Sequence, residues 1–103
     1  MNATLYLPNG EHRTVDPING MQFSLDELGE LVGGAPDTLF ALVLEDSGTA
    51  IIGRKGDRTP INHAATEVIQ HWIGPYCEAF GRALHCPIER VPPEILPGGE
   101  LAK

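Results

Sequence analysis

Residues 23–34 have the sequence FSLDELGELVGG, and the other elements of the chain can be placed before and after this stretch. Ser24 and Glu27 have the spacing of a capping box, in which each side chain accepts the backbone N–H of the other residue at a helix N-terminus. Phe23 and Leu28 occupy the two positions of a hydrophobic staple. The stretch therefore predicts one short helix.

The predicted helix has a defined end and one apolar stripe. Gly33 can take the left-handed conformation that closes a last helical turn. Leucine and valine side chains recur at helical spacing along one side, so this side must be buried against another part of the chain. The flanking segments predict that this other part is a β-sheet.

The N-terminal segment predicts a β-hairpin. Residues 3–8 alternate between apolar and polar side chains, as in a half-buried strand. Asn9 and Gly10 form a strong hairpin signal, and residues 11–15 give the return strand. Pro8 indicates that this hairpin includes an exposed sheet edge.

A second hairpin and a second helix follow the first helix. Residues 38–44 are nearly all apolar, which predicts a central strand buried on both faces. Turn residues at 46–48 lead to a partner strand that starts at residues 49–52. Residues 60–72 show the periodicity of a helix that is stopped by glycine and proline at 74–75.

Two interpretations are open for residues 76–91, either a further helix or a strand kinked at Gly81 that runs to about residue 88. We favour the strand, because the sheet needs another element to pair its central run and a long helix does not tolerate Gly81 and Pro87. The result is an α+β fold in which a hairpin, a helix, a hairpin, a helix and a strand form a small, mostly antiparallel sheet of about five strands with two helices. We expect one domain over residues 1–91 and a disordered extension over 92–103.

Composition limits the classes of function. The 103 residues carry 14 acidic and 7 basic side chains, a net charge of -7, which argues against direct binding to nucleic acid backbones. Acidic mimicry of a nucleic acid is an alternative, but the acids are spread singly and indicate a solvated surface. We find no signal peptide and no membrane-spanning run, and the two cysteines are too few for a disulfide framework, so we expect a cytoplasmic protein.

A basic, glycine-containing loop is the candidate for an anion site. Arg54, Lys55 and Arg58 could surround a phosphate near the start of the second helix, at Asn62 and His63. The spacing does not match a P-loop. A solvent-exposed connection is the alternative that we favour for this loop.

A metal site on the second helix is the next alternative. His63, Glu67 and His71 lie four residues apart and could point at one metal ion. The pattern lacks a second ligand cluster, so we expect a wet polar helix face and no metal or cofactor. Trp72, close by, either packs in the core or belongs to a partner surface.

Nucleophilic catalysis would need one of the two cysteines, Cys77 or Cys86, with His85 or His12 as its base. His85 and Cys86 are sequence neighbours and cannot face each other in a strand. We therefore expect incidental cysteines, no catalytic residue and no enzymatic activity.

Two segments resemble a family of short phage and plasmid proteins that is described as a domain of unknown function. They are residues 25–34, LDELGELVGG, and residues 59–66, TPINHAAT. The family commonly has Arg where this chain has His63. The resemblance implies a mobile-element origin, and small acidic phage proteins often bind and inhibit a host protein.

These observations predict a small non-enzymatic interaction module in the bacterial host cytoplasm, an inhibitor of a defence system that acts by binding a host protein. The alternative is a binder of a phosphorylated or nucleotide-like ligand through the basic loop. A free hairpin edge also makes a sheet-mediated homodimer a candidate.

Overall fold

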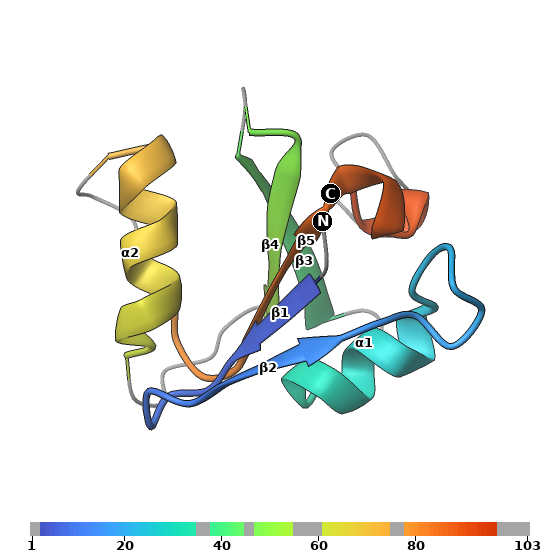
Figure 1. Cartoon of the computed structure of the whole chain (residues 1–103), viewed down its shortest axis with the longest axis horizontal. Coiled ribbons are helices and arrows are strands. Elements are labelled where there is room, and N and C mark those ends of the chain that lie inside the picture. The colour runs from blue at the N-terminus through green and yellow to red at the C-terminus, as the bar shows by residue number, and fades with distance from the viewer. Residues whose placement is uncertain (1–2, 35–37, 45–46, 55–60, 75–77, 97–103) are drawn as a thin grey trace.

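The computed structural model describes residues 3–34, 38–44, 47–54, 61–74 and 78–96. These residues form a single antiparallel sheet of five strands and two α-helices, which is the predicted α+β fold (Figure 1). The elements are, in order, β1 (Ala3–Tyr6), β2 (His12–Val15), α1 (Leu25–Val32), β3 (Leu39–Leu44), β4 (Thr49–Arg54), α2 (His63–Trp72), β5 (Ala83–Pro87) and the short 3-10 helices η2 (Ile88–Arg90) and η3 (Pro93–Ile95). None of the described helices combines the length and the apolar character needed to cross a bilayer.

The last strand lies in the middle of the sheet, whose order is β2-β1-β5-β4-β3. Leu84 of β5 faces Leu5 of β1 on one side and Ile52 of β4 on the other. The strand predicted for this segment is confirmed over Ala83–Pro87, while residues 75–77 lie outside the described part. The hairpin edge indicated by Pro8 is also confirmed, because β2 is an outer strand.

The prediction that residues 38–44 form a central strand is wrong. β3 is an edge strand, and Phe40 is 38% exposed. The strand that is buried on both faces is its hairpin partner β4, in which every residue from Thr49 to Gly53 is buried. An apolar run does not by itself define strand order, because β5 pairs with β4 from a distant part of the chain.

The predicted capping box of α1 is confirmed. Ser24 Oγ accepts the N–H of Glu27 at 3.1 Å, and Glu27 Oε1 accepts the N–H of Ser24 at 3.0 Å. Gly33 has φ 81° and its N–H donates to Gly29 O at 2.7 Å, so the helix ends where the glycine allows the left-handed conformation.

The sheet is covered on both faces, with α1 and α2 on opposite sides (Figure 1). We call these the α1 face and the α2 face. The α1-face cluster joins strand residues to α1 and to the C-terminal 3-10 helices, and its buried members are Ala3, Leu5, Phe23, Leu28, Val32, Leu39, Ala50, Ile52, Leu84, Cys86, Val91 and Ile95. The smaller α2-face cluster contains Leu44, Ile51, Ala65, Ile69, Ala79 and Ala83.

The C-terminal segment differs from the expected disordered extension at residues 92–96. Pro93–Ile95 form η3, and Ile95 is fully buried in the α1-face cluster together with Val91. The prolines of this segment are compatible with a 3-10 turn, and Ile95 attaches the segment to the core. The sequence did not predict this contact, because the segment is short and has no helix or strand periodicity. Residues 97–103 lie outside the described part.

Candidate functional site

Three of the five residues predicted to bind an anion lie in described parts of the chain. Arg54 ends β4, while Asn62 caps α2 and His63 begins it. Lys55 and Arg58 lie outside the described residues.

Arg54 makes a contact with the end of α1. Its Nη1 donates a hydrogen bond to the carbonyl of Gly33. The last carbonyls of a helix lack partners within the helix, and a cation is favourable there. Arg54 therefore ties the end of β4 to the end of α1.

Asn62 has a structural role in the interior. Its Oδ1 accepts the N–H of Ala65 at 3.1 Å, which caps α2, and its Nδ2 donates to Tyr6 O at 2.9 Å and to Gly81 O at 2.8 Å. The side chain is fully buried, so both amide donors and its acceptor are used within the protein. Of the three described residues of the predicted set, His63 at the start of α2 is the exposed one.

The polar row of α2 faces solvent. His63, Glu67 and His71 are exposed, and no group of three or more potential metal ligands occurs within the described residues. Trp72 is 44% exposed, and its ring meets that of His71 edge-on at 5.2 Å between centroids. Trp72 therefore lies at the surface, at the end of α2.

His85 belongs to a hydrogen-bonded chain whose direction can be assigned. Ser47 Oγ donates to Leu44 O at 2.5 Å, so Thr49 Oγ1 must donate across its 2.6 Å contact with Ser47 Oγ. His85 Nε2 lies 2.9 Å from Thr49 Oγ1 and is therefore the donor in that pair. A protonated Nε2 cannot accept the Thr49 proton, so the arrangement stabilises the β3–β4 turn and does not activate a nucleophile.

The two neighbours on β5 have different surroundings, as the alternation of a strand predicts. Cys86 is fully buried in the α1-face cluster, and burial raises the pKa of its thiol to about 12. His85 instead contacts Thr49, and its pKa is lowered by burial. Cys86 is thus a protonated apolar side chain at neutral pH, whereas Cys77 lies outside the described part.

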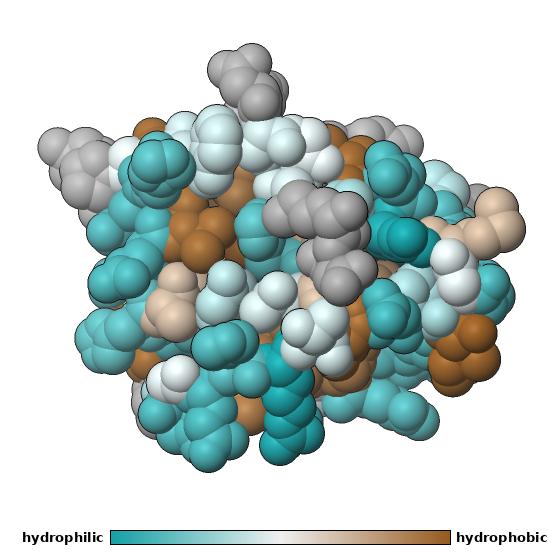
Figure 2. All heavy atoms as spheres, viewed as in Figure 1, coloured by the Kyte–Doolittle hydropathy of each residue, from teal (hydrophilic) through white to brown (hydrophobic). Residues whose placement is uncertain are grey.

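The most unusual surface belongs to the loop of residues 17–22, between β2 and α1. Ile18 is 89% exposed and Met21 is 75% exposed, which makes them the most exposed large apolar side chains among the described residues. Figure 2 shows apolar surface at the end of the molecule where this loop protrudes in Figure 1, next to hydrophilic neighbours. Exposed apolar surface with a rim of polar residues is a feature that interaction sites share.

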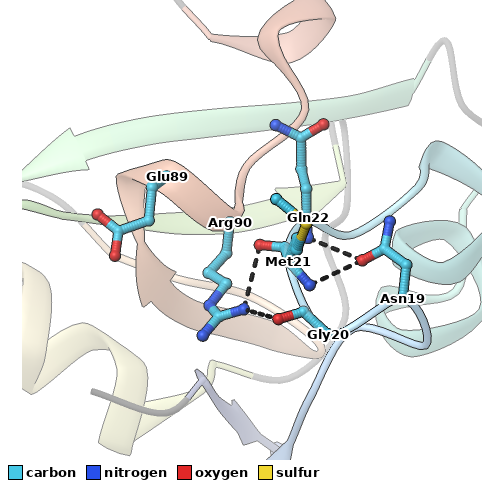
Figure 3. Close-up of a pocket in the computed structure, with 6 residues that line it drawn as sticks. All are labelled: Asn19, Gly20, Met21, Gln22, Glu89 and Arg90. Atoms are coloured by element: carbon cyan, nitrogen blue, oxygen red, sulfur yellow. Dashed lines mark hydrogen bonds between the residues drawn. The ribbon is translucent and has the colours of Figure 1, made fainter.

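The backbone of this loop is held by its own side chains. Asn19 Oδ1 accepts the N–H groups of Met21 and Gln22, each at 2.9 Å (Figure 3). Gly20 has φ 76°, and its N–H donates to Pro17 O at 2.9 Å. These bonds define a tight turn between the two exposed apolar residues.

Distant residues hold the same loop from both sides. Arg90 Nη1 donates to Gly20 O at 2.6 Å and to Met21 O at 3.1 Å (Figure 3), and Glu27 Oε2 accepts the N–H of Ile18 at 2.9 Å. The pKa of Glu27 is lowered, mainly by that bond from Ile18. The backbone of the loop is therefore held at Ile18, Gly20 and Met21 by side chains from outside the loop.

Two hollows flank the loop. One has a volume of about 500 Å³ and is lined by the loop and by η2, through Asn19, Gly20, Met21, Gln22, Glu89 and Arg90 (Figure 3). The other has a volume of about 330 Å³ and lies between β2, the loop and α1. Its lining combines apolar residues with the acidic residues Asp16, Glu27 and Glu30.

The sequence analysis did not identify this loop as a candidate site. Two local signals were present, because Asn19 and Gly20 form a turn pair and two large apolar residues flank it within a segment that has no helix or strand periodicity. The contact from Arg90 had no local signal, since it joins residues about 70 positions apart.

Comparisons of the chain with protein-family models, with curated proteins and with solved structures gave no match. The resemblance to the phage and plasmid family therefore stays a prediction.

Proposed function

We propose that the chain is a protein-binding module whose contact surface is the loop of residues 17–22 together with its two flanking hollows. The observation that carries the proposal is the exposure of Ile18 and Met21 on a loop whose backbone donates a hydrogen bond to Glu27 and accepts hydrogen bonds from Arg90. Large apolar side chains that are surrounded by polar residues are typical of binding surfaces.

The order of the loop favours binding. A partner that buries Ile18 and Met21 removes apolar surface from water, a gain of about 25 cal/mol per Å². Ordering a mobile loop on binding would oppose that gain. Because Asn19 and Arg90 already hold the loop, most of this ordering cost is absent.

The charge of the surface indicates the chemistry of the partner. Asp16, Glu27 and Glu30 line the hollow beside Ile18, and the chain carries a net charge of -7. A partner surface with apolar side chains next to Lys or Arg would complement both features and would be attracted at long range.

The proposed function is non-enzymatic binding. For the alternative, a phosphorylated or nucleotide-like ligand held at the basic loop, Arg54 and Asn62 would have to leave contacts that they already make with Gly33, Tyr6 and Gly81. These contacts favour the protein partner over the anion.

The resemblance to phage and plasmid proteins adds an expectation about the partner. We propose a bacterial host protein, with inhibition of a defence system as the consequence of binding. This part of the proposal rests on the resemblance alone, and identification of the partner tests it.

The experiment is an affinity capture from bacterial lysate with quantitative mass spectrometry. We compare the native chain with the double variant Ile18→Ser, Met21→Ser and with the matched control Ile73→Ser, which removes an apolar side chain that is 46% exposed elsewhere. We expect one stoichiometric partner on the native chain and on the control, with at least about tenfold less on the double variant, as for the loss of a binding hot spot.

Circular dichroism and thermal unfolding of all three chains establish that the variants fold. A partner captured equally by the native chain and the folded double variant would contradict the proposed surface. Capture of nothing by the native chain would contradict the proposed host partner.

A further inference from the structure

The outer side of β3 is an open strand edge. β3 pairs with β4 on one side, and on its other side no described strand continues the sheet. The nearby η3 makes its backbone hydrogen bonds within its own turn. The N–H of Ile95 donates to the carbonyl of Pro92, and the N–H of Leu96 donates to the carbonyl of Pro93. Among the described residues, no backbone group pairs with the outward N–H and C=O groups of β3.

The two edge strands, β2 and β3, differ in the features that protect a strand from pairing with another chain. β2 has four residues, it carries His12 and Arg13, and Pro8 and Pro17 lie close to its ends. β3 has six residues, LFALVL, without charge, proline or glycine. Proteins commonly protect a strand edge by charge, proline or short length, and β3 has none of these features.

We infer that β3 pairs in an antiparallel manner with β3 of a second copy of this chain, which extends the sheet across a two-fold axis. The charge of the molecule favours this location, because two copies that each carry -7 can approach most closely where neither has a charged side chain. An edge strand is also self-complementary under a two-fold axis, since it offers the same donors and acceptors to its copy.

The register of this pairing follows from the alternation of the strand. Directly paired residues point to the same face of a sheet, so a two-fold axis perpendicular to the sheet sets one residue opposite its own copy. With the axis at Leu42, Phe40 lies opposite Leu44 and Ala41 lies opposite Val43 of the second copy, and all of these residues belong to β3.

This inference concerns a different surface from the proposed partner site. The loop of residues 17–22 packs between β2, α1 and η2, whereas β3 is at the opposite edge of the sheet from β2. A dimer would therefore present two copies of the loop. Either proposal can fail without the other.

The test measures the mass of the native chain by sedimentation and by light scattering, up to about 1 mM, where weak association is detectable. We expect a concentration-dependent rise from 11.1 kDa toward twice that mass. The rise should become steeper at higher salt, because salt screens the repulsion between two acidic copies. A chain that stays at 11.1 kDa throughout would overturn the inference.

Two pairs of variants, each with one change on β3 and one on β2, locate the interface. Phe40→Lys places a charge on the open edge and should lower association at least about tenfold, whereas Thr14→Lys on β2 should leave it unchanged. Leu42→Cys should form a disulfide-linked dimer under mild oxidation, and Thr14→Cys should not, which gives a second result if Phe40→Lys fails to fold. Equal cross-linking of both cysteine variants, or association unaffected by a folded Phe40→Lys chain, would overturn the assigned edge.

Discussion

Glu27 holds Ile18 in place: the carboxylate Oε2 of Glu27 accepts the backbone N–H of Ile18 at 2.9 Å. The other oxygen of the same carboxylate accepts the N–H of Ser24 and completes the cap of α1. One side chain therefore fixes both the start of a helix and the position of the most exposed large apolar residue among the described residues.

Replacement of Glu27 by glutamine should break one of the two hydrogen bonds that its carboxylate accepts. In the native chain the N–H groups of Ser24 and Ile18 bond to different oxygens of the carboxylate, so the amide of the variant would place its NH2 group, which is a donor, against one of these two N–H groups. We expect Glu27→Gln to lower the free energy of unfolding by about 1 kcal/mol, in the range of a lost cap. Chemical denaturation measures this change, and Glu30→Gln on the same helix is the matched control.

The effect of Glu27 should depend on pH. Its hydrogen bonds lower its pKa below the ordinary value of 4.5, so the folded chain binds the proton less well than the unfolded chain. The stabilisation is therefore complete above pH 4.5 and is lost as the pH falls through the lowered pKa. The difference in stability between the native chain and Glu27→Gln should shrink in acid, and a constant difference would show that the carboxylate charge is irrelevant.

Arg90 should order the loop without contributing much to global stability. Arg90→Met keeps an apolar stem but removes the donor to Gly20 O and Met21 O. We expect faster hydrogen exchange at Met21 and Gln22 and a change of only about 1 kcal/mol in unfolding free energy, typical of a half-exposed hydrogen bond. Partner affinity should fall because the loop must be ordered on binding.

Hydrogen-exchange mass spectrometry at peptide resolution provides the measurement. The control is Arg82→Met, which makes the same substitution at an exposed arginine. Unchanged exchange in the loop of the Arg90→Met chain would mean that Asn19 alone maintains the turn.

The parts of the fold that were predicted correctly depend on short-range patterns. The cap of α1 follows from Ser24 and Glu27, which lie three residues apart, and the hairpins follow from adjacent turn residues. Strand order could not be predicted, because the placement of β5 between β1 and β4 depends on contacts between distant segments. The apolar run of β3 was consistent with either a central or an edge strand.

The structural roles of Arg54 and Asn62, two residues of the predicted anion site, could not be predicted for a related reason. Arg54 and Asn62 were grouped by their proximity in sequence, yet Arg54 bonds to Gly33 and Asn62 bonds to Tyr6 and Gly81. A basic residue or a polar residue near a helix start suits an anion, but the same residue also suits a helix cap. The sequence does not distinguish these roles when the partner is a distant backbone carbonyl.

Asn62 should therefore be a strong determinant of stability. Asn62→Ala removes the cap of α2 and leaves the buried carbonyls of Tyr6 and Gly81 without their donors. We expect a loss of about 3 kcal/mol of unfolding free energy, from the cap and the unpaired buried groups together. Urea denaturation tests this, and Asn9→Ala in the exposed hairpin turn should cost much less. Similar losses for the two variants would contradict the buried role of Asn62.

His85 should make the fold sensitive to mild acid. Burial lowers its pKa below the ordinary value of 6.5, so the unfolded chain takes up a proton at a higher pH than the folded chain does. Between those two pKa values the unfolded state binds more protons, and stability therefore falls as the pH drops below 6.5. We expect unfolding free energies measured from about pH 8 downward to decline less for His85→Gln, which keeps a donor for Thr49, than for the native chain. A native curve that stays flat below pH 6.5 would contradict a neutral, half-buried His85.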